Sequence, residues 1–333
     1  YPLLLTKAIT EIYGSRWSGL PVFSHREIQK QTQKVYPLLR MPFTHSYDGV
    51  QLYYADYGPR NSLLPVLFLS HGFGSSSKLW DAQLPELVKA GYRCILWDMR
   101  GHAQSDAPPA NSTTSPNTYS KWSQIHDMKA VLAACRVLPL HARTNVGVPF
   151  IMMAHSMGGM DQLLFAMKWP NAASGMVLYG TGPGFKSDKG RVGWNKQASK
   201  IATTYATKGL EALVGSDKTK GHRSVEGLIA ACLGNYTQRE DDPLALEFAP
   251  SGGPLALARN LKSIRQPTAV LIGQYDKVFG RASDMMAKTL PRATLYTVNG
   301  GGHMACEKTP KEFNDVLLRA LGELRQWVGG SKL

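Results

Sequence analysis

Cysteine, acidic side chains and long apolar runs are all scarce in this 333-residue chain. Its four cysteines include no C-x-x-C pair, which argues against a disulfide framework or a zinc site and predicts reduced, structural thiols. No apolar run approaches the roughly 20 residues of a membrane-spanning helix, so we expect a soluble globular protein without a transmembrane segment. The length allows a large core, formed by one α/β domain with an insertion or by two domains.

Acidic residues are outnumbered by basic ones, 24 against 38, and the net charge is +14. The basic residues form no dense tract with interleaved aromatic residues, so nucleic-acid binding is not predicted. A basic solvated surface is the simpler interpretation of the charge. The sharper alternative is attraction of an anionic substrate such as an acyl-CoA.

Apolar segments alternate with helix-like segments, which predicts an α/β fold with a parallel sheet covered by helices on both faces. The alternation breaks between residues 182 and 262, where we expect a helical cap inserted above the site. The chain then divides into an accessory segment (1–42), a core (43–181 and 263–328), the cap, and a tail (329–333). Strands are expected at 43–47, 50–57, 65–69, 93–97, 148–153, 175–179, 268–272 and 293–298, and helices at 79–90, 119–138, 159–167, 281–289 and 310–327.

The segment Ala154–Gly158 carries the strongest functional signal. It joins an apolar run to a helix-like run, so its central residue, Ser156, lies on a sharp turn from strand to helix. This arrangement is typical of the nucleophile elbow of serine hydrolases, in which the turn exposes the hydroxyl and the start of the helix faces the reacting carbonyl. The alternative is an ordinary turn whose serine caps the helix.

Two later residues complete a catalytic triad in the order serine, acid, histidine. Asp276 follows the strand predicted at 268–272, and His303 lies in a glycine-rich loop after the last strand. His303 is the predicted base, and Asp276 is predicted to accept a hydrogen bond from its Nδ1–H, fix the tautomer and stabilise the imidazolium. Asp276 as a turn residue and His303 as a surface residue are the alternatives.

Glycines also follow the strand predicted at 65–69, in His71–Gly74. Glycine lets the backbone approach a bound substrate closely. We therefore predict that the N–H groups of Phe73 and Met157 form the oxyanion hole.

The motifs His71–Gly74, Asp98–Ser105, Ala154–Gly159, Asp276 and His303 together resemble the α/β-hydrolase superfamily, and specifically its capped, single-domain members. The resemblance covers about residues 43 to 328 and implies the α/β-hydrolase fold with an inserted helical cap. Ala154 and Ala103 stand where the family usually has glycine. Asp98–Ser105 resembles a loop that is usually structural in the family, so His102 is given no catalytic role. The serine nucleophile argues against epoxide hydrolases and haloalkane dehalogenases, which use aspartate.

These residues predict a serine hydrolase that cleaves an ester or thioester of a small-molecule acyl substrate, as a carboxylesterase, lipase or acyl-CoA thioesterase, without a metal or organic cofactor. An acyltransferase or cyclase using the same site, and a non-catalytic binding protein with this fold, are the alternatives. Aromatic side chains of the cap are candidates for an acyl pocket: Phe185, Trp194, Tyr205 and Tyr236. The first half of the cap is basic, with Lys186, Lys189, Arg191, Lys196, Lys200, Lys208, Lys218, Lys220 and Arg223.

The last three residues, Ser331, Lys332 and Leu333, match the C-terminal address read by the peroxisomal import receptor. They predict a location in the peroxisomal matrix, which agrees with the cysteine usage; the alternative is a chance tripeptide. With this tail, the chain is also loosely similar to fungal-type peroxisomal serine hydrolases, including some from secondary-metabolite pathways.

Overall fold

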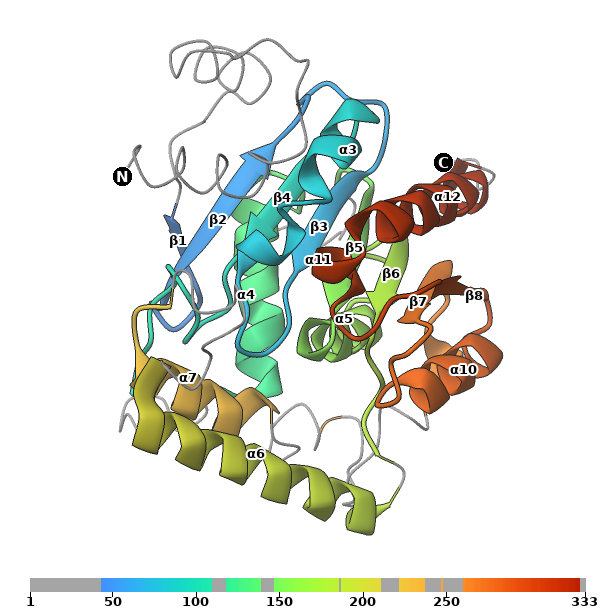
Figure 1. The fold of residues 1–333 in the computed structure, drawn as a ribbon. Helices are drawn as coiled ribbons and strands as arrows, with labels where there is room; N and C mark the ends of the chain where they lie inside the picture. The colour runs from blue at the N-terminus through green and yellow to red at the C-terminus, as the bar shows by residue number, and fades with distance from the viewer. Residues whose placement is uncertain are drawn as a thin grey trace, which may run out of the picture. The chain divides into compact units, whose positions relative to one another are not determined.

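The computed structural model describes residues 43–109, 118–138, 147–185, 187–210, 222–236, 247 and 260–329. The predicted accessory segment and the tripeptide Ser331–Leu333 lie outside them. The described residues contain an eight-stranded sheet in the order β1-β2-β4-β3-β5-β6-β7-β8 (Figure 1). β1 and β2 run antiparallel to their neighbours, and the six strands from β3 to β8 run parallel to one another.

The strands are β1 (Phe43–His45), β2 (Gln51–Tyr57), β3 (Val66–Ser70), β4 (Cys94–Trp97), β5 (Phe150–His155), β6 (Gly175–Tyr179), β7 (Thr268–Gly273) and β8 (Ala293–Val298). The helices are α3 (Leu84–Lys89), α4 (Lys121–Ala134), α5 (Met157–Lys168), α6 (Asp188–Lys208), α7 (Val225–Ala231), α10 (Gly280–Thr289), α11 (Ala305–Lys308) and α12 (Pro310–Gly329). Three short helical turns are η1 (Ser77–Trp80), η4 (Cys232–Tyr236) and η5 (Leu261–Ser263).

Alternate side chains of the sheet enter two hydrophobic cores. On β3, Leu67 and Leu69 face one core and Phe68 faces the other, and on β5 Ile151 and Met152 divide in the same way. All five are fully buried. Because both faces of the central strands are covered, nearly every position of β3 to β7 is apolar and buried, which explains the continuous apolar runs in the sequence.

The covering helices form two layers (Figure 1). α4, α5 and α10 pack in the core that contains Phe68, and α3, α11 and α12 pack in the core that contains Leu67. Phe165 of α5 and Phe313 of α12 are completely buried, one in each layer. Truncation of such a side chain to alanine costs about 3–5 kcal/mol, so both layers hold the sheet in place.

The α/β fold with helices on both faces is confirmed, with one correction to the predicted elements. The segment 79–90 does not form a single helix, because η1 ends at Trp80 and α3 begins only at Leu84. Pro85 lies in the first turn of α3, where its missing N–H costs no hydrogen bond, so it favours a new start there. The short helix α11 was not predicted.

A buried ion-pair cluster anchors the loop after β4. Arg100 is inaccessible to solvent; its guanidinium bonds both carboxylate oxygens of Asp127 at 2.6 Å and those of Asp48 at 2.8 and 3.1 Å. It also donates to the carbonyl of Thr118 at 2.6 Å. Removal of one partner from such a buried cluster is strongly destabilising, which supports a structural role for Asp98–Ser105.

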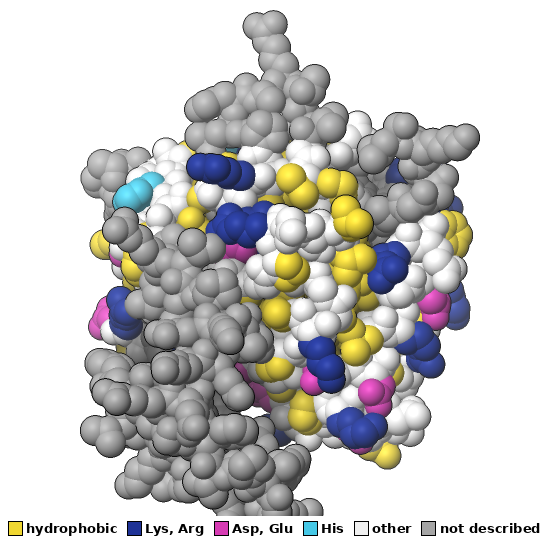
Figure 2. Space-filling model, turned by 90° about the horizontal axis from the view of Figure 1, so that it is seen from above, with side chains coloured by type: hydrophobic (Ala, Val, Ile, Leu, Met, Phe, Trp, Pro, Cys, Tyr) yellow, Lys and Arg dark blue, Asp and Glu magenta, His cyan; other side chains and the backbone are white. Residues whose placement is uncertain are grey.

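The helices α6 and α7 lie together at one end of the molecule, past the carboxyl ends of the parallel strands (Figure 1). Both fall within the segment predicted as a cap. The parts of that segment at 186, 211–221, 237–246 and 248–259 lie outside the described residues. Figure 2 views the side away from α6 and shows Lys and Arg side chains scattered among uncharged ones, not gathered into one continuous patch.

All four cysteines are buried and none forms a disulfide, as the sequence predicts. None of the helices among the described residues has both the length and the hydropathy that crossing a membrane requires.

Candidate active site

Ser156 occupies the turn between β5 and α5 in an unusual backbone conformation. Its φ is 52° and its ψ is −120°, a region that residues other than glycine seldom adopt and that marks functional sites. A capping serine would accept an N–H of the first helical turn, but Ser156 makes no such side-chain bond. The capping alternative therefore fails, and the hydroxyl is left for another role.

Backbone hydrogen bonds from β6 and the following loop hold this turn. The N–H of Ser156 donates to the carbonyl of Tyr179 at 3.0 Å. The carbonyl of Ser156 accepts the Thr181 hydroxyl at 2.6 Å and the Gly159 N–H at 2.9 Å. These bonds offset the cost of the strained conformation and fix the direction of the Ser156 side chain.

Small residues around Ser156 are needed for close packing at some positions and not at others. A Cβ at Gly158 would lie 2.4 Å from the carbonyl oxygen of His71, and one at Gly159 would lie 2.5 Å from Thr181. Ala154, by contrast, is an ordinary residue of β5, paired with both neighbouring strands. Its departure from the family's glycine is therefore compatible with the turn.

His303 and Asp276 meet at the carboxyl ends of β7 and β8. The Nδ1 of His303 lies 2.7 Å from one carboxylate oxygen of Asp276. The second oxygen accepts the N–H groups of Val278 and Phe279, each at 3.1 Å, which holds the carboxylate in place. An ionised carboxylate only accepts hydrogen bonds, so His303 carries its proton on Nδ1, and the lone pair of Nε2 remains available as a base.

The environment of Asp276 keeps its carboxylate ionised. Burial would raise the pKa of Asp276, but the hydrogen bond and charge of His303, together with the two backbone N–H groups, lower it below its ordinary value. Gly180 leaves room for the pair, because a Cβ there would lie 3.1 Å from His303 Nδ1 and 3.3 Å from the carboxylate. The Phe279 ring stacks on the imidazole at 5.0 Å and limits its orientation.

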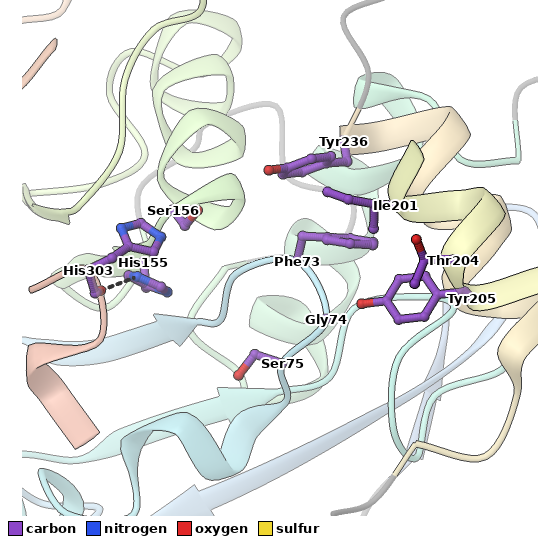
Figure 3. Close-up of a pocket in the computed structure, with 10 residues that line it drawn as sticks. All are labelled: Phe73, Gly74, Ser75, His155, Ser156, Ile201, Thr204, Tyr205, Tyr236 and His303. Carbon is purple, nitrogen blue, oxygen red and sulfur yellow. Dashed lines mark hydrogen bonds between the residues drawn. The ribbon is translucent and has the colours of Figure 1, made fainter. Parts of the chain in front are cut away.

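Ser156 and His303 line the same cavity, which has a volume of about 350 Å³. Figure 3 shows the His303 ring beside Ser156, with the histidine presented from the loop after β8. The triad predicted from the sequence is thus brought together around one cavity. The complete lining is Phe73, Gly74, Ser75, His155, Ser156, Ile201, Thr204, Tyr205, Tyr236 and His303.

The two predicted oxyanion donors come from adjacent segments. Phe73 lies in the turn after β3, and Met157 is the first residue of α5. A Cβ at Gly72 would lie 3.0 Å from Ser156 Cβ, so the first segment passes directly beside the nucleophile. In the described residues, neither the Phe73 nor the Met157 N–H has a hydrogen-bond acceptor, so both can donate to a bound oxygen.

Three histidines that the triad does not use brace the loop carrying Phe73. His71 Nε2 accepts the N–H of Met99 at 2.9 Å, and His102 Nε2 accepts the N–H of Gly74 at 3.1 Å. His222, just before α7, donates from Nε2 to the carbonyl of Gly74 at 3.2 Å. Burial lowers the pKa of His71 to about 4, and burial with the neighbouring histidines lowers that of His102, so both rings stay neutral at pH 7.

The four predicted pocket aromatics divide into two pairs. Tyr205 and Tyr236 line the cavity, whereas Phe185 and Trp194 lie outside its wall. Trp194 supports Tyr236, because its indole N–H donates to the Tyr236 carbonyl at 2.8 Å and the rings lie 4.8 Å apart. Phe185 packs on Trp194 at 5.6 Å.

Ile201, Thr204 and His222 were not predicted. Ile201 lies three residues before Thr204 and four before Tyr205, and residues three and four apart are neighbours on a helix, so this spacing is the signal that could have found Ile201. No local pattern indicates His222, which reaches its loop across 148 positions of sequence. Among the described residues, no group of three or more His, Cys, Asp or Glu side chains could hold a metal ion.

Comparisons with known proteins identify the family and the fold. A family model for the alpha/beta hydrolase fold matches residues 65–310. A Bacillus subtilis protein with the provisional name 2-succinyl-6-hydroxy-2,4-cyclohexadiene-1-carboxylate synthase is 27% identical over 280 residues, 81% of this chain and 94% of that protein. A bifunctional esterase/perhydrolase of Acinetobacter calcoaceticus is 30% identical over 131 residues, 39% of this chain and 41% of that protein.

Solved structures share the fold. One, reported in a study of carboxylesterases of Nitrososphaera gargenis, superposes with a TM-score of 0.67 at 21% identity and covers 86% of this chain and 99% of its own. The MenH protein of S. aureus superposes with a TM-score of 0.65 at 19% identity, over 82% of this chain and 98% of its own.

Proposed function

The chain belongs to the alpha/beta hydrolase fold family, and from that premise we propose that it is a serine hydrolase that cleaves an ester or thioester. The observation that carries the proposal is the strained Ser156, whose hydroxyl makes no capping bond and which shares a cavity with the Asp276-bound His303. The ester class is supported by the similarity to an esterase/perhydrolase.

In the proposed reaction, Ser156 Oγ attacks the acyl carbonyl while His303 Nε2 takes the hydroxyl proton. The Asp276 carboxylate stabilises the imidazolium, and the N–H groups of Phe73 and Met157 donate to the oxyanion. The tetrahedral intermediate collapses as His303 returns the proton to the leaving alcohol or thiol, which leaves an acyl-enzyme. Water activated by His303 then releases the acid and restores the serine.

A labelling experiment tests the mechanism directly. A fluorophosphonate should attach to Ser156 of the folded protein, and Ser156→Ala should abolish the attachment. Ser75 provides a matched control, because it lines the same cavity and its replacement by alanine should leave the labelling intact. Folded protein that takes up no label would contradict the serine-hydrolase mechanism.

Lysines beside the cavity make an acyl-CoA thioester the substrate to test first. Lys200 and Lys208 lie four residues before and after Thr204, which lines the cavity, and therefore share its side of α6. Both are exposed, and neither lies within ion-pair distance of a carboxylate in the described residues. Two positive side chains on this side of α6 would attract the phosphates of coenzyme A.

This steering is sensitive to salt. Raising the ionic strength from 50 to 500 mM should increase KM for an acyl-CoA several-fold and leave KM for an uncharged ester nearly unchanged. The double variant Lys200→Glu/Lys208→Glu should already have the increased KM for an acyl-CoA at low ionic strength. An equal salt response of both substrates would exclude steering.

Import into the peroxisome remains a separate proposal that rests on Ser331–Leu333. A fluorescent protein fused before Tyr1 keeps that tripeptide at the end of the fusion. The fusion should enter peroxisomes, and its counterpart without the tripeptide should stay in the cytosol. Import of both fusions would contradict the assignment.

A further inference from the structure

Two tyrosine hydroxyls enter the cavity opposite the nucleophile. Tyr205 projects from α6, and Tyr236 is the last residue of η4. In Figure 3 the Tyr236 hydroxyl points toward the side occupied by Ser156, and the Tyr205 hydroxyl points toward Gly74. Tyr205 is only 5% exposed, so its ring is embedded in the protein and its oxygen opens onto the cavity.

Neither hydroxyl has a hydrogen-bond partner among the described residues. Tyr119 and Tyr179, elsewhere in the protein, do have one: Tyr119 donates to the carbonyl of Pro108 at 2.9 Å, and Tyr179 donates to that of His303 at 2.7 Å. A ligand that covers a tyrosine hydroxyl without accepting its hydrogen bond incurs the cost of desolvating that group. The hydroxyls of Tyr205 and Tyr236 can therefore donate to an acceptor on a ligand in the cavity.

Both tyrosines are donors at neutral pH and are held in place. Burial raises the pKa of each to about 12, so the hydroxyl protons remain. The Phe73 ring stacks on that of Tyr236 at 4.6 Å and lies 6.1 Å from that of Tyr205. The Trp194 ring also packs on Tyr236, at 4.8 Å. Hydrogen-bond donors fixed among apolar rings favour ligands that carry an acceptor, and only at positions that the donors can reach.

We propose that the hydroxyls of Tyr205 and Tyr236 mark two positions in the cavity where a keto oxygen of the substrate can be bound, so that oxo-acyl groups are preferred over plain alkyl chains. The inference rests on the proposed serine-hydrolase function and adds a substrate class to it. A keto oxygen accepts a hydrogen bond from the tyrosine hydroxyl beside it, whereas an alkyl chain would cover the hydroxyls without giving either an acceptor. The remaining wall, with Phe73 and Ile201, accommodates the carbon skeleton in either case.

The test compares 4-nitrophenyl hexanoate with its 4-oxo and 5-oxo derivatives. Wild-type kcat/KM should be about tenfold higher for at least one oxo ester than for hexanoate, the factor expected for one to two hydrogen bonds. At least one of the variants Tyr205→Phe and Tyr236→Phe should lower kcat/KM for that oxo ester by roughly five- to tenfold, and both should change kcat/KM for hexanoate less than twofold. Tyr275→Phe is the matched control, because Tyr275 is 63% exposed.

A second readout does not depend on turnover. Fluorophosphonates with a hexyl or an oxohexyl chain react once with Ser156. An oxohexyl reagent should label the wild type faster than the hexyl reagent does, and a Phe variant that slows turnover of the oxo ester should also slow this labelling. Labelling by both at equal rates, or equal losses for both in the Phe variants, would overturn the subsite alone. Absence of any labelling would overturn the proposed function and the subsite with it.

Discussion

The His222 imidazole donates from Nε2 to the carbonyl of Gly74 at 3.2 Å, in the loop His71–Gly74 that carries the proposed oxyanion donor and is called the oxyanion loop below. Its Nδ1 accepts a hydrogen bond from the N–H of Ala103 at 3.2 Å. Ala103 is one of the few described non-glycine residues with positive φ, at 41°. A single imidazole therefore joins the segment before α7 to two strained or tightly turned loops. It is placed to position the neighbouring Phe73 N–H.

We expect His222→Ala to lower kcat for an ester roughly tenfold or more while KM changes less, because a misplaced oxyanion donor weakens transition-state binding most. His222→Gln, whose amide can both donate and accept, should recover part of the activity. His45→Ala, at an exposed site, is the control. A loss of thermal stability without a fall in kcat would show that His222 serves folding alone.

Asp276→Asn should lower kcat by about 10⁴ with little loss of fold. The amide oxygen can still accept the N–H groups of Val278 and Phe279, but the amide nitrogen would then face His303 Nδ1. A donor in that place favours the tautomer with its proton on Nε2, which cannot take the proton of Ser156. Kinetics and circular dichroism of the purified variant would check both statements, and near-normal kcat would remove Asp276 from the triad.

Gly158→Ala should disrupt the elbow, because the added Cβ would lie 2.4 Å from the backbone oxygen of His71 and 3.1 Å from Ser70 Cβ. Such overpacking costs about 1–3 kcal/mol and displaces the oxyanion loop, so activity should fall at least tenfold. Gly322→Ala has no atom within 4 Å of the new Cβ and should stabilise α12 by about 0.5–1 kcal/mol. Thermal melting with an ester assay compares the two, and equal effects would contradict the packing argument.

The sheet and the triad were predictable because each depends on local pattern. Strands buried on both faces, such as β6, have continuous apolar sequences, and the predicted strand at 175–179 forms with those bounds. The strand predicted at 293–298 also forms with its predicted bounds, although several of its residues are exposed. Ser156, Asp276 and His303 each follow a parallel strand, and the carboxyl ends of such strands meet at one edge of the sheet. Chain order and strand ends therefore sufficed to bring the three together.

The cavity wall was less predictable, because it depends on how α6 lies against the sheet. Trp194 and Tyr205 fall on nearly the same face of this helix, but eleven residues separate them by roughly 16 Å along its axis. Only the later residue reaches the cavity. The periodicity of a helix shows which residues share a face, but it does not show which part of that face lies over the cavity.

Protonation of His71 should make folding sensitive to mild acid. Its pKa is about 4 in the folded protein because of burial, against 6.5 for an ordinary histidine. Between those values the unfolded chain binds more protons, so the stability of the wild type falls as the pH decreases from 6.5 to 4. The difference of about 2.5 pKa units corresponds to about 3 kcal/mol.

The variant His71→Gln keeps a donor and an acceptor but does not titrate. Denaturant unfolding of both proteins at several pH values from 7 to 4 isolates the contribution of His71, since buried Asp98 and Asp127 titrate in both and largely cancel in the comparison. The stability of the wild type relative to the variant should decrease by up to about 3 kcal/mol across this interval. Parallel pH curves would show that the folded protein takes up a proton at His71 as readily as the unfolded chain does, which would contradict a lowered pKa for this imidazole.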